Sequence, residues 1–176
     1  MFDRDKFKRL VHFVIAQAGN KPGFGAVKLN KVLWFAEARQ YMLTGHPIAG
    51  AEYIREEFGP VPREINAVRR ELEAEGKIKT SAPKAAYEGW RFRSLQSPNL
   101  TGFSQDEIKL VNWWIGYVAD EHTAQSISEE SHDYAWDIAK LREPLPFHAF
   151  FASRLRTPND GELDWARQAA GRAGLV

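Results

Sequence analysis

Apolar residues recur every three to four positions in much of this chain, which is the spacing of one face of an α-helix. In residues 4–18 the stripe is Phe7, Leu10, Val11, Val14 and Ala18, with Asp3 or Asp5 as the cap. Residues 26–44 carry apolar and aromatic side chains on more than one side and end at Gly45. A helix of that kind is central or lies at an interface.

Turn and capping residues indicate where the other helices begin. Pro62 suits the first position of a helix over 62–75, because the missing N–H costs nothing there. Ser-Gln-Asp-Glu at 104–107 is a capping box, and Thr123 caps a helix over 122–132. A last helix is predicted over 161–173, whereas residues 147–155 fit a strand or a helix equally well.

The period changes from 3.6 to 2 in KIKT (77–80) and GWRFRSL (89–95), which predicts a β-hairpin with a longer loop. Ile78, Trp90 and Phe92 would face one side. The opposite side carries four cations, Lys77, Lys79, Arg91 and Arg93. We therefore expect a single compact domain over residues 1–176 that is mainly α with a small β-hairpin (α+β). Its first half is winged-helix-like, because three helices precede the hairpin.

Composition agrees with one globular domain, since 44% of the 176 residues are hydrophobic and 27% are charged. The chain has no cysteine, which excludes disulfides, thiolate metal sites and a thiol nucleophile. It has no apolar run long enough to cross a membrane, and MFDRDKFKRL lacks the apolar core of a signal peptide. We expect a cytoplasmic protein without a membrane partner.

Residues that would support catalysis do not form a known pattern. The five histidines include no pair one helical turn apart with a glutamate between them. Ser131, His132 and Asp133 are neighbours in sequence, so their side chains point apart and cannot form a triad. PGFGAVK (22–28) lacks the Gly-Lys-Ser/Thr ending of a phosphate-binding loop. The sequence thus favours a binding protein with no catalytic residues, no cofactor and no metal.

Charge is unevenly distributed along the chain. Residues 1–95 contain seventeen lysines and arginines against eleven acidic residues, and residues 96–143 contain three against nine. This asymmetry indicates two faces of opposite sign or a partner recognised by charge. One alternative is a winged-helix DNA-binding transcriptional regulator that contacts nucleic acid through the four hairpin cations. The helix over 62–75 fits that role poorly, because its glutamates outnumber its arginines.

Three stretches together resemble one family: KLNKVLWFAE (28–37), TGHPIAGAEYIREEFGPVP (44–62) and SISEESHDYAW (126–136). The combination is similar to the Panacea domain, or SocA-like antitoxin domain. The resemblance covers about residues 5–140, with Phe58 where tyrosine is common in the family, and leaves 141–176 as an unmatched C-terminal extension. It implies an antitoxin of a toxin–antitoxin system that neutralises a cognate protein toxin, encoded nearby, by direct stoichiometric binding.

Other roles of such domains stay open. A proteolysis adaptor that delivers its partner to a cytosolic protease is a further alternative, and the apolar tail AGRAGLV (170–176) would suit a protease handle. Neutralisation itself needs no catalytic group, only a rigid and partly apolar surface.

The stiff segment EFGPVP (57–62) is the first candidate for that surface, because fixed prolines lose little entropy on binding. The alternative is that this segment only turns the chain and packs Phe58 in the core. Lys28, Asn30 and Lys31 would likewise bind a partner or hydrogen-bond across the fold, and His132 with Trp136 would be structural. The predicted contact residues are Asn30, Lys31, Trp34, Tyr53, Arg55, Phe58, Gly59, Pro60 and Val61.

Overall fold

The computed structural model describes residues 1–83, 89–154 and 159–172. Its helices are α1 (Arg4–Ala18), α2 (Ala26–Thr44), α3 (Ile65–Ala74), α4 (Gln105–Gly116), α5 (Ala124–Glu130), α6 (Tyr134–Ile138) and α7 (Asp160–Arg172). A π-helical turn, η1 (Tyr117–Glu121), continues α4, and a 3₁₀ helix, η2 (Phe147–Arg154), precedes α7. The strands form two antiparallel pairs: β1 (Tyr53–Glu56) with β2 (Gly59–Pro62), and β3 (Ile78–Ser81) with β4 (Arg91–Ser94).

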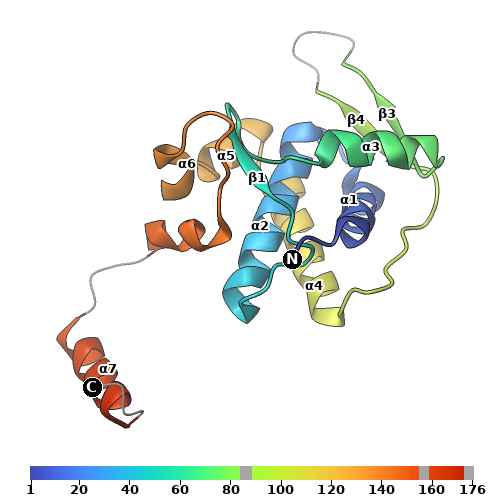
Figure 1. The fold of residues 1–176 in the computed structure, drawn as a ribbon. Coiled ribbons are helices and arrows are strands. Elements are labelled where there is room, and N and C mark those ends of the chain that lie inside the picture. Colours follow the sequence, from blue (N-terminus) through green and yellow to red (C-terminus); the bar gives the residue numbers. More distant parts are fainter. Residues whose placement is uncertain (84–88, 155–158, 173–176) are drawn as a thin grey trace.

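Helix α2 is the centre of the fold, and α1, α4, α5, β2 and η2 all contact it (Figure 1). Its apolar residues are buried on several sides, as the sequence predicted. Trp34 stacks on Phe147 of η2 on one side, and Phe35 stacks on Trp114 of α4, with ring centroids 4.8 Å apart, on the other. The fold is thus mainly α with small β-hairpins, which confirms the predicted class.

Several helix ends form as their capping residues predict. The side chain of Asp3 accepts a hydrogen bond from the amide of Lys6 at the start of α1. Ser104 and Glu107 form both bonds of the capping box that opens α4, and Thr123 caps α5. Gly45 takes a left-handed conformation, with φ of 76°, that ends α2.

Three local predictions were wrong or incomplete. Pro62 lies in β2 instead of the first turn of a helix, and α3 begins at Ile65. Trp90 was expected on the buried side of the hairpin with Ile78 and Phe92, but it is 41% exposed while both others are buried. The segment 147–155, for which the sequence left strand or helix open, is a 3₁₀ helix as far as Arg154.

The C-terminal helix α7 buries none of its residues, and Figure 1 shows it apart from the other helices. Its predicted apolar residues, Leu163 and Trp165, are both exposed. The proposed protease handle at 170–176 falls partly outside the described residues. Within the part of the chain that the structure describes, no helix has the length and apolar character needed to cross a membrane.

Candidate partner-binding surface

The segment around EFGPVP forms a β-hairpin whose prolines stand at alternate positions. Pro60 lies opposite Arg55 in the register, and Pro62 lies opposite Tyr53. Antiparallel pairs alternate between hydrogen-bonded and non-hydrogen-bonded, and a proline has no N–H to exchange. Both prolines therefore occupy the non-hydrogen-bonded pairs, where the missing donor faces away from the partner strand. The two prolines stiffen β2 without interrupting the pairing.

The other edge of β1 is covered by residues 142–145. The amide of Arg55 donates to the carbonyl of Glu143 at 2.9 Å, and the carbonyl of Arg55 accepts from the amide of Arg142 at 2.7 Å. The amide of Leu145 donates to the carbonyl of Tyr53 at 2.7 Å. These bonds show that the backbone groups of Arg55 and Tyr53 point away from β2. Strand β1 is therefore paired along both of its edges.

Helices α5 and α6 hold the turn at the end of this hairpin. Ser128 of α5 donates its hydroxyl to the carbonyl of Phe58 at 2.8 Å, and the indole N–H of Trp136 in α6 donates to the carbonyl of Glu56 at 3.0 Å. The guanidinium of Arg55 lies 4.0 Å from the centre of the Trp136 ring, and the His132 ring stacks on the same indole with 3.6 Å between the ring centroids. The carbonyls of Glu56 and Phe58, before and within the turn, are thus each bound by a distant part of the chain.

At Gly59 the hairpin backbone lies close to side chains of α2 and of the segment after α5. Its φ is 96°, a conformation that side chains other than hydrogen rarely adopt. A Cβ atom at this position would collide with the hydroxyl of Ser131 and the ammonium of Lys31. Two features therefore favour glycine here: the positive φ of the backbone and the lack of space for a Cβ atom.

Lys31 is the buried cation beneath the hairpin, with only 1% of its surface exposed. Its ammonium lies 3.4 Å from the carbonyl of Pro60, and no carboxylate of the described residues forms an ion pair with it. Burial lowers the pKa of Lys31 to about 7. Lys28 reaches the carbonyl of Ala119 at 3.1 Å. Both lysines thus hydrogen-bond across the fold, one of the two alternatives that the sequence left open.

His132 and Trp136 were predicted to be structural; Trp136 contacts the hairpin directly, and His132 stacks on the ring of Trp136. His132 is half-buried, and burial together with the nearby charges of Lys31 and Arg55 lowers its pKa. The sequence pointed to Ser131 only as part of a rejected triad, and it did not point to Ser128 individually. Their signal as supports of the hairpin was their place in SISEESHDYAW, one of the three stretches that carry the family resemblance.

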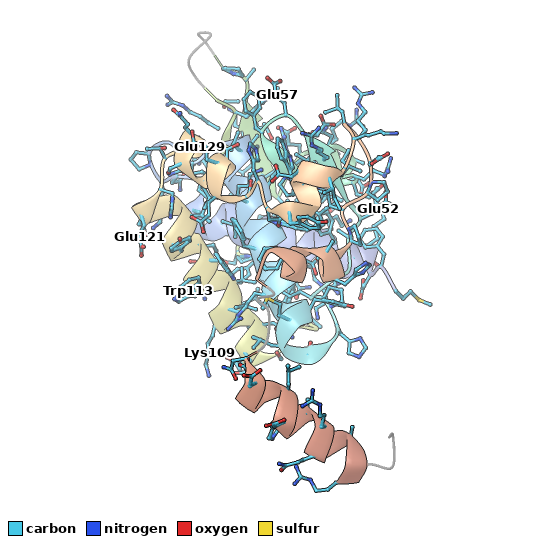
Figure 2. All side chains as sticks on the ribbon, turned by 90° about the vertical axis from the view of Figure 1, so that its left-hand side faces the viewer. Glu52, Glu57, Lys109, Trp113, Glu121 and Glu129 are labelled. Atoms are coloured by element: carbon cyan, nitrogen blue, oxygen red, sulfur yellow. The ribbon has the colours of Figure 1, made fainter. Side chains whose placement is uncertain are left out.

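Large apolar side chains remain exposed around the fixed turn. Phe58, at its tip, is 59% exposed, so the alternative in which it packs in the core is wrong. Three more exposed apolar residues lie in α6 or just after it. We call the four residues together the tip face: Phe58, Tyr134, Ile138 and Leu141. Figure 2 looks at the side of the molecule that carries α5 and α6, with Glu57 of the turn and Glu129 of α5 labelled in its upper part.

The nine predicted contact residues divide by burial into three groups. Side chains or backbone of Lys31, Trp34, Tyr53, Gly59 and Pro60 are buried, so in this structure they support the surface from below. Asn30, Arg55 and Val61 are partly exposed. Phe58 alone is exposed. The structure brings most of the set together around one hairpin, but only part of it reaches the surface.

The four residues predicted to contact nucleic acid differ in exposure and in ion pairing. Lys79, Arg91 and Arg93 are exposed on β3 and β4, whereas Lys77 forms an ion pair with Glu75 at 2.7 Å. Among the described residues, no group of three histidine or acidic side chains is arranged to hold a metal ion.

A family model described as Antitoxin SocA-like, Panacea domain, matches residues 29–137. No curated protein matches the chain, and no solved structure matches it. The matched range begins in α2 and ends in α6. It therefore contains the β1–β2 hairpin, the buried Lys31 and both helices that hold the turn.

Proposed function

The chain belongs to the SocA-like Panacea domain family of antitoxins, and from this premise we propose that it neutralises a cognate protein toxin by direct, stoichiometric contact. The family suggests a non-catalytic regulatory role. Binding alone achieves neutralisation when the antitoxin covers the surface that the toxin needs for its own activity. We propose that this takes place in the cytoplasm, with a toxin encoded next to this gene.

The observation that carries the proposal is an exposed aromatic side chain on a rigid support. Phe58 projects from a two-residue turn; Ser128 binds the carbonyl of Phe58 itself, and Trp136 binds the carbonyl of Glu56 just before the turn. Gly59 and two prolines follow it. A support that is already ordered loses little conformational entropy on binding, so more of the contact energy appears as affinity.

The tip face has the composition of an interface centre. Aromatic and aliphatic side chains that are half or more exposed gain the most when a partner removes them from water. Arg55, stacked on Trp136, and the carboxylate of Glu57 supply a polar rim around them. We propose that the toxin interface is centred here, extends over Val61 and Asn30, and buries on the order of 1,600 Å² in total.

A growth assay tests this proposal. The open reading frame adjacent to this gene is induced alone and then together with this protein. We expect growth to stop in the first case and to recover in the second. A neighbour that is harmless, or that stays toxic although this protein accumulates in soluble form, would overturn the proposal of a cognate neighbouring toxin.

A surface variant then locates the contact. Phe58→Ala combined with Ile138→Ala removes two exposed apolar side chains without touching the bonds that hold the turn. We expect this double variant to lose protection while its circular dichroism and melting temperature stay those of the wild type. Leu43→Ala with Leu95→Ala, two exposed apolar residues outside the tip face, is the control and should protect fully. Protection by both variants would move the interface elsewhere.

A further inference from the structure

The C-terminal helix α7 has an apolar side that its own chain leaves exposed. At about 100° per residue, five apolar residues share one side of the helix: Leu163, Trp165, Ala166, Ala169 and Ala170. Trp165 is 67% exposed, and α7 buries none of its residues. With 13 residues, α7 has the length at which isolated helices are only marginally stable in water. A surface that covers its apolar side would therefore stabilise it.

The charge of α7 changes sign along its length. Residues 160–164 contain three carboxylates, whereas Arg167 and Arg172 follow in the second half. Glu162 lies on the apolar side, but its carboxylate accepts a hydrogen bond from the amide of Asn159 at 2.9 Å and so caps the start of the helix. The helix thus has an apolar side, an acidic beginning and a basic end.

An apolar groove of about 520 Å³ lies between α2 and α4. Leu43 and Trp113 are its most exposed apolar side chains, at 60% and 58%. Trp113, which is labelled on α4 in Figure 2, stacks on Tyr117 with 5.3 Å between the ring centroids. Phe150 of η2 also lines the groove and is buried. The groove therefore offers aromatic and aliphatic surface of the kind that an amphipathic helix covers.

The two charged residues of the groove lining lie at opposite ends. Lys28, near the start of α2, reaches the carbonyl of Ala119 beyond the end of α4, whereas the middle of α2 stacks on α4 itself, so the two helices run antiparallel. Arg39, in the second half of α2, therefore lies towards the start of α4. Glu130 accepts a hydrogen bond from the hydroxyl of Tyr117, just after the end of α4, at 3.1 Å. The groove is thus positive at one end and negative at the other.

We propose that α7 packs in the α2–α4 groove of a second copy of this chain, so that two chains exchange their C-terminal helices in a two-fold symmetric dimer. Leu163 packs near Leu43, and Trp165 packs on Trp113. Each chain supplies one helix and one groove, so the symmetry satisfies both surfaces on both chains and closes the assembly at two copies.

The charges of helix and groove fit one orientation of α7. Its acidic beginning lies beside Arg39, and Arg172 at its end lies beside Glu130. From Asp164 to Arg172 the helix rises about 12 Å, close to the rise of about 10 Å along α4 between Leu110 and Tyr117, two residues that line the groove. The reversed orientation places like charges together at both ends.

The same chain's α7 is the alternative occupant, because Phe150 precedes the start of α7 by only ten residues. The structure favours the second copy, since α7 lies apart from α2 and α4 of its own chain and buries none of its residues (Figure 1). The exchange leaves the tip face free, because that face lies on the β1–β2 turn and the α6 region. Dimerisation and the proposed toxin contact therefore use separate surfaces.

Light scattering of the full chain over a concentration series tests this proposal. We expect a mass twice the 20.1 kDa of one chain, which falls to that of the monomer on dilution. Trp165→Ala and Trp113→Ala should each weaken the dimer about a hundredfold, because a tenfold loss per contact occurs twice in a symmetric dimer. Trp113→Phe keeps an aromatic ring and should stay dimeric. Phe58→Ala with Ile138→Ala, on the tip face, is the control and should dimerise as the wild type does.

Cross-linking identifies the occupant of the groove. The chain has no cysteine, so introduced cysteines react without background. Leu43→Cys and Leu163→Cys are placed in two differently tagged chains, which are mixed and treated with a short bismaleimide. We expect a product that carries both tags. Leu95→Cys replaces Leu43→Cys in the control, because Leu95 is exposed but does not line the groove, and this pair should give little product.

Several outcomes would overturn the proposal: a monomer at every concentration, assemblies larger than a dimer, or equal loss of the dimer in the tip-face control. A chain that carries both cysteines and cross-links only within itself would assign the groove to its own α7. A monomer that loses toxin affinity in Trp165→Ala would assign α7 to the toxin instead. Circular dichroism shows that each variant is folded. Because the mass and cross-linking measurements contain no toxin, they do not depend on the proposed neutralisation.

Discussion

The indole nitrogen of Trp136 lies 3.0 Å from the carbonyl oxygen of Glu56, eighty positions away in sequence. This hydrogen bond joins α6 to the last residue of β1, immediately before the turn that carries Phe58. The same ring supports Arg55 on β1. The position of the exposed tip therefore depends on a residue that the tip itself does not contain.

Replacing Trp136 by phenylalanine tests this dependence. The variant keeps an aromatic ring but leaves the carbonyl of Glu56 without its donor, so we expect a loss of about 1–2 kcal/mol in the free energy of unfolding. Urea denaturation measures this loss. Trp113→Phe is the control, because Trp113 is exposed and labelled on the outer face of α4 in Figure 2. A cost for Trp113→Phe as large as that for Trp136→Phe would contradict the assigned role.

Gly59→Ala tests the close approach of the hairpin to Lys31 and Ser131. Gly45→Ala is a matched control, because Gly45 also has a positive φ, of 76°, but a Cβ there would meet open space. The control should cost about 1–2 kcal/mol for the left-handed backbone alone. Gly59→Ala should cost clearly more and should abolish protection from the toxin. Equal costs in thermal denaturation would show that the contact with Lys31 and Ser131 has no energetic weight.

Lys31→Met should alter how stability depends on pH. The pKa of Lys31 is lowered from 10.5 to about 7 in the folded protein, so the unfolded chain binds more protons between these values. Through this group, wild-type stability rises as pH increases from about 7 towards 10.5. The methionine variant lacks this rise. The difference in unfolding free energy in favour of the variant should therefore be largest near pH 7 and should shrink at higher pH. His132, whose pKa is also lowered, titrates below this window.

A stability advantage of Lys31→Met that stays constant with pH would contradict the burial of a titrating ammonium. Replacing both partners of a buried polar contact by apolar groups is often neutral or stabilising. The variant therefore also shows whether the lysine is retained at a cost to stability. Denaturant titrations at several pH values supply the measurement.

Glu37 should affect the pH dependence of wild-type stability in the opposite direction to Lys31, and Glu37→Gln tests this. Glu37 is fully buried in α2 and accepts hydrogen bonds from the amides of Ala49 and Gly50 at 3.0 and 3.2 Å. Burial raises its pKa from 4.5 to about 7, despite these bonds, so the folded state binds more protons in this window. Wild-type stability contributed by Glu37 therefore falls as pH rises from 4.5 to 7. Glutamine keeps an acceptor for both amides and should remove that fall.

Comparison with the wild type makes the pH test specific for Glu37. His12 and His132 titrate in both the wild type and Glu37→Gln, so their effects cancel in the comparison. If the difference in unfolding free energy between the two proteins did not change from about pH 4.5 to 7, Glu37 would not be protonated on folding.

The helices could be predicted from sequence because their signals are local. Asp3, the Ser104 capping box and Gly45 each act within one turn of the helix that they begin or end. The stripe in α1 and the β3–β4 alternation similarly depend on near neighbours. These elements formed within a few residues of the predicted bounds.

The β1–β2 hairpin could not be predicted in the same way. Pro60 and Pro62 normally argue against a strand, and only the register shows that their nitrogens face away from β1. The position of the turn that carries Phe58 depends on Ser128 and Trp136, which lie far along the chain. The candidate site was therefore found through the three sequence stretches that resemble the family. Which of its residues are buried supports and which are exposed could be seen only in the structure.

Calorimetric titration of the purified neighbouring toxin into this protein tests neutralisation by direct contact. We expect a one-to-one complex whose affinity falls at least tenfold in Phe58→Ala with Ile138→Ala, as is usual when interface anchors are truncated. We expect unchanged affinity in Lys79→Gln with Arg93→Gln, whose residues lie on the β3–β4 hairpin. The absence of a complex, or a tip-face variant that binds as tightly as the wild type, would contradict neutralisation through this surface.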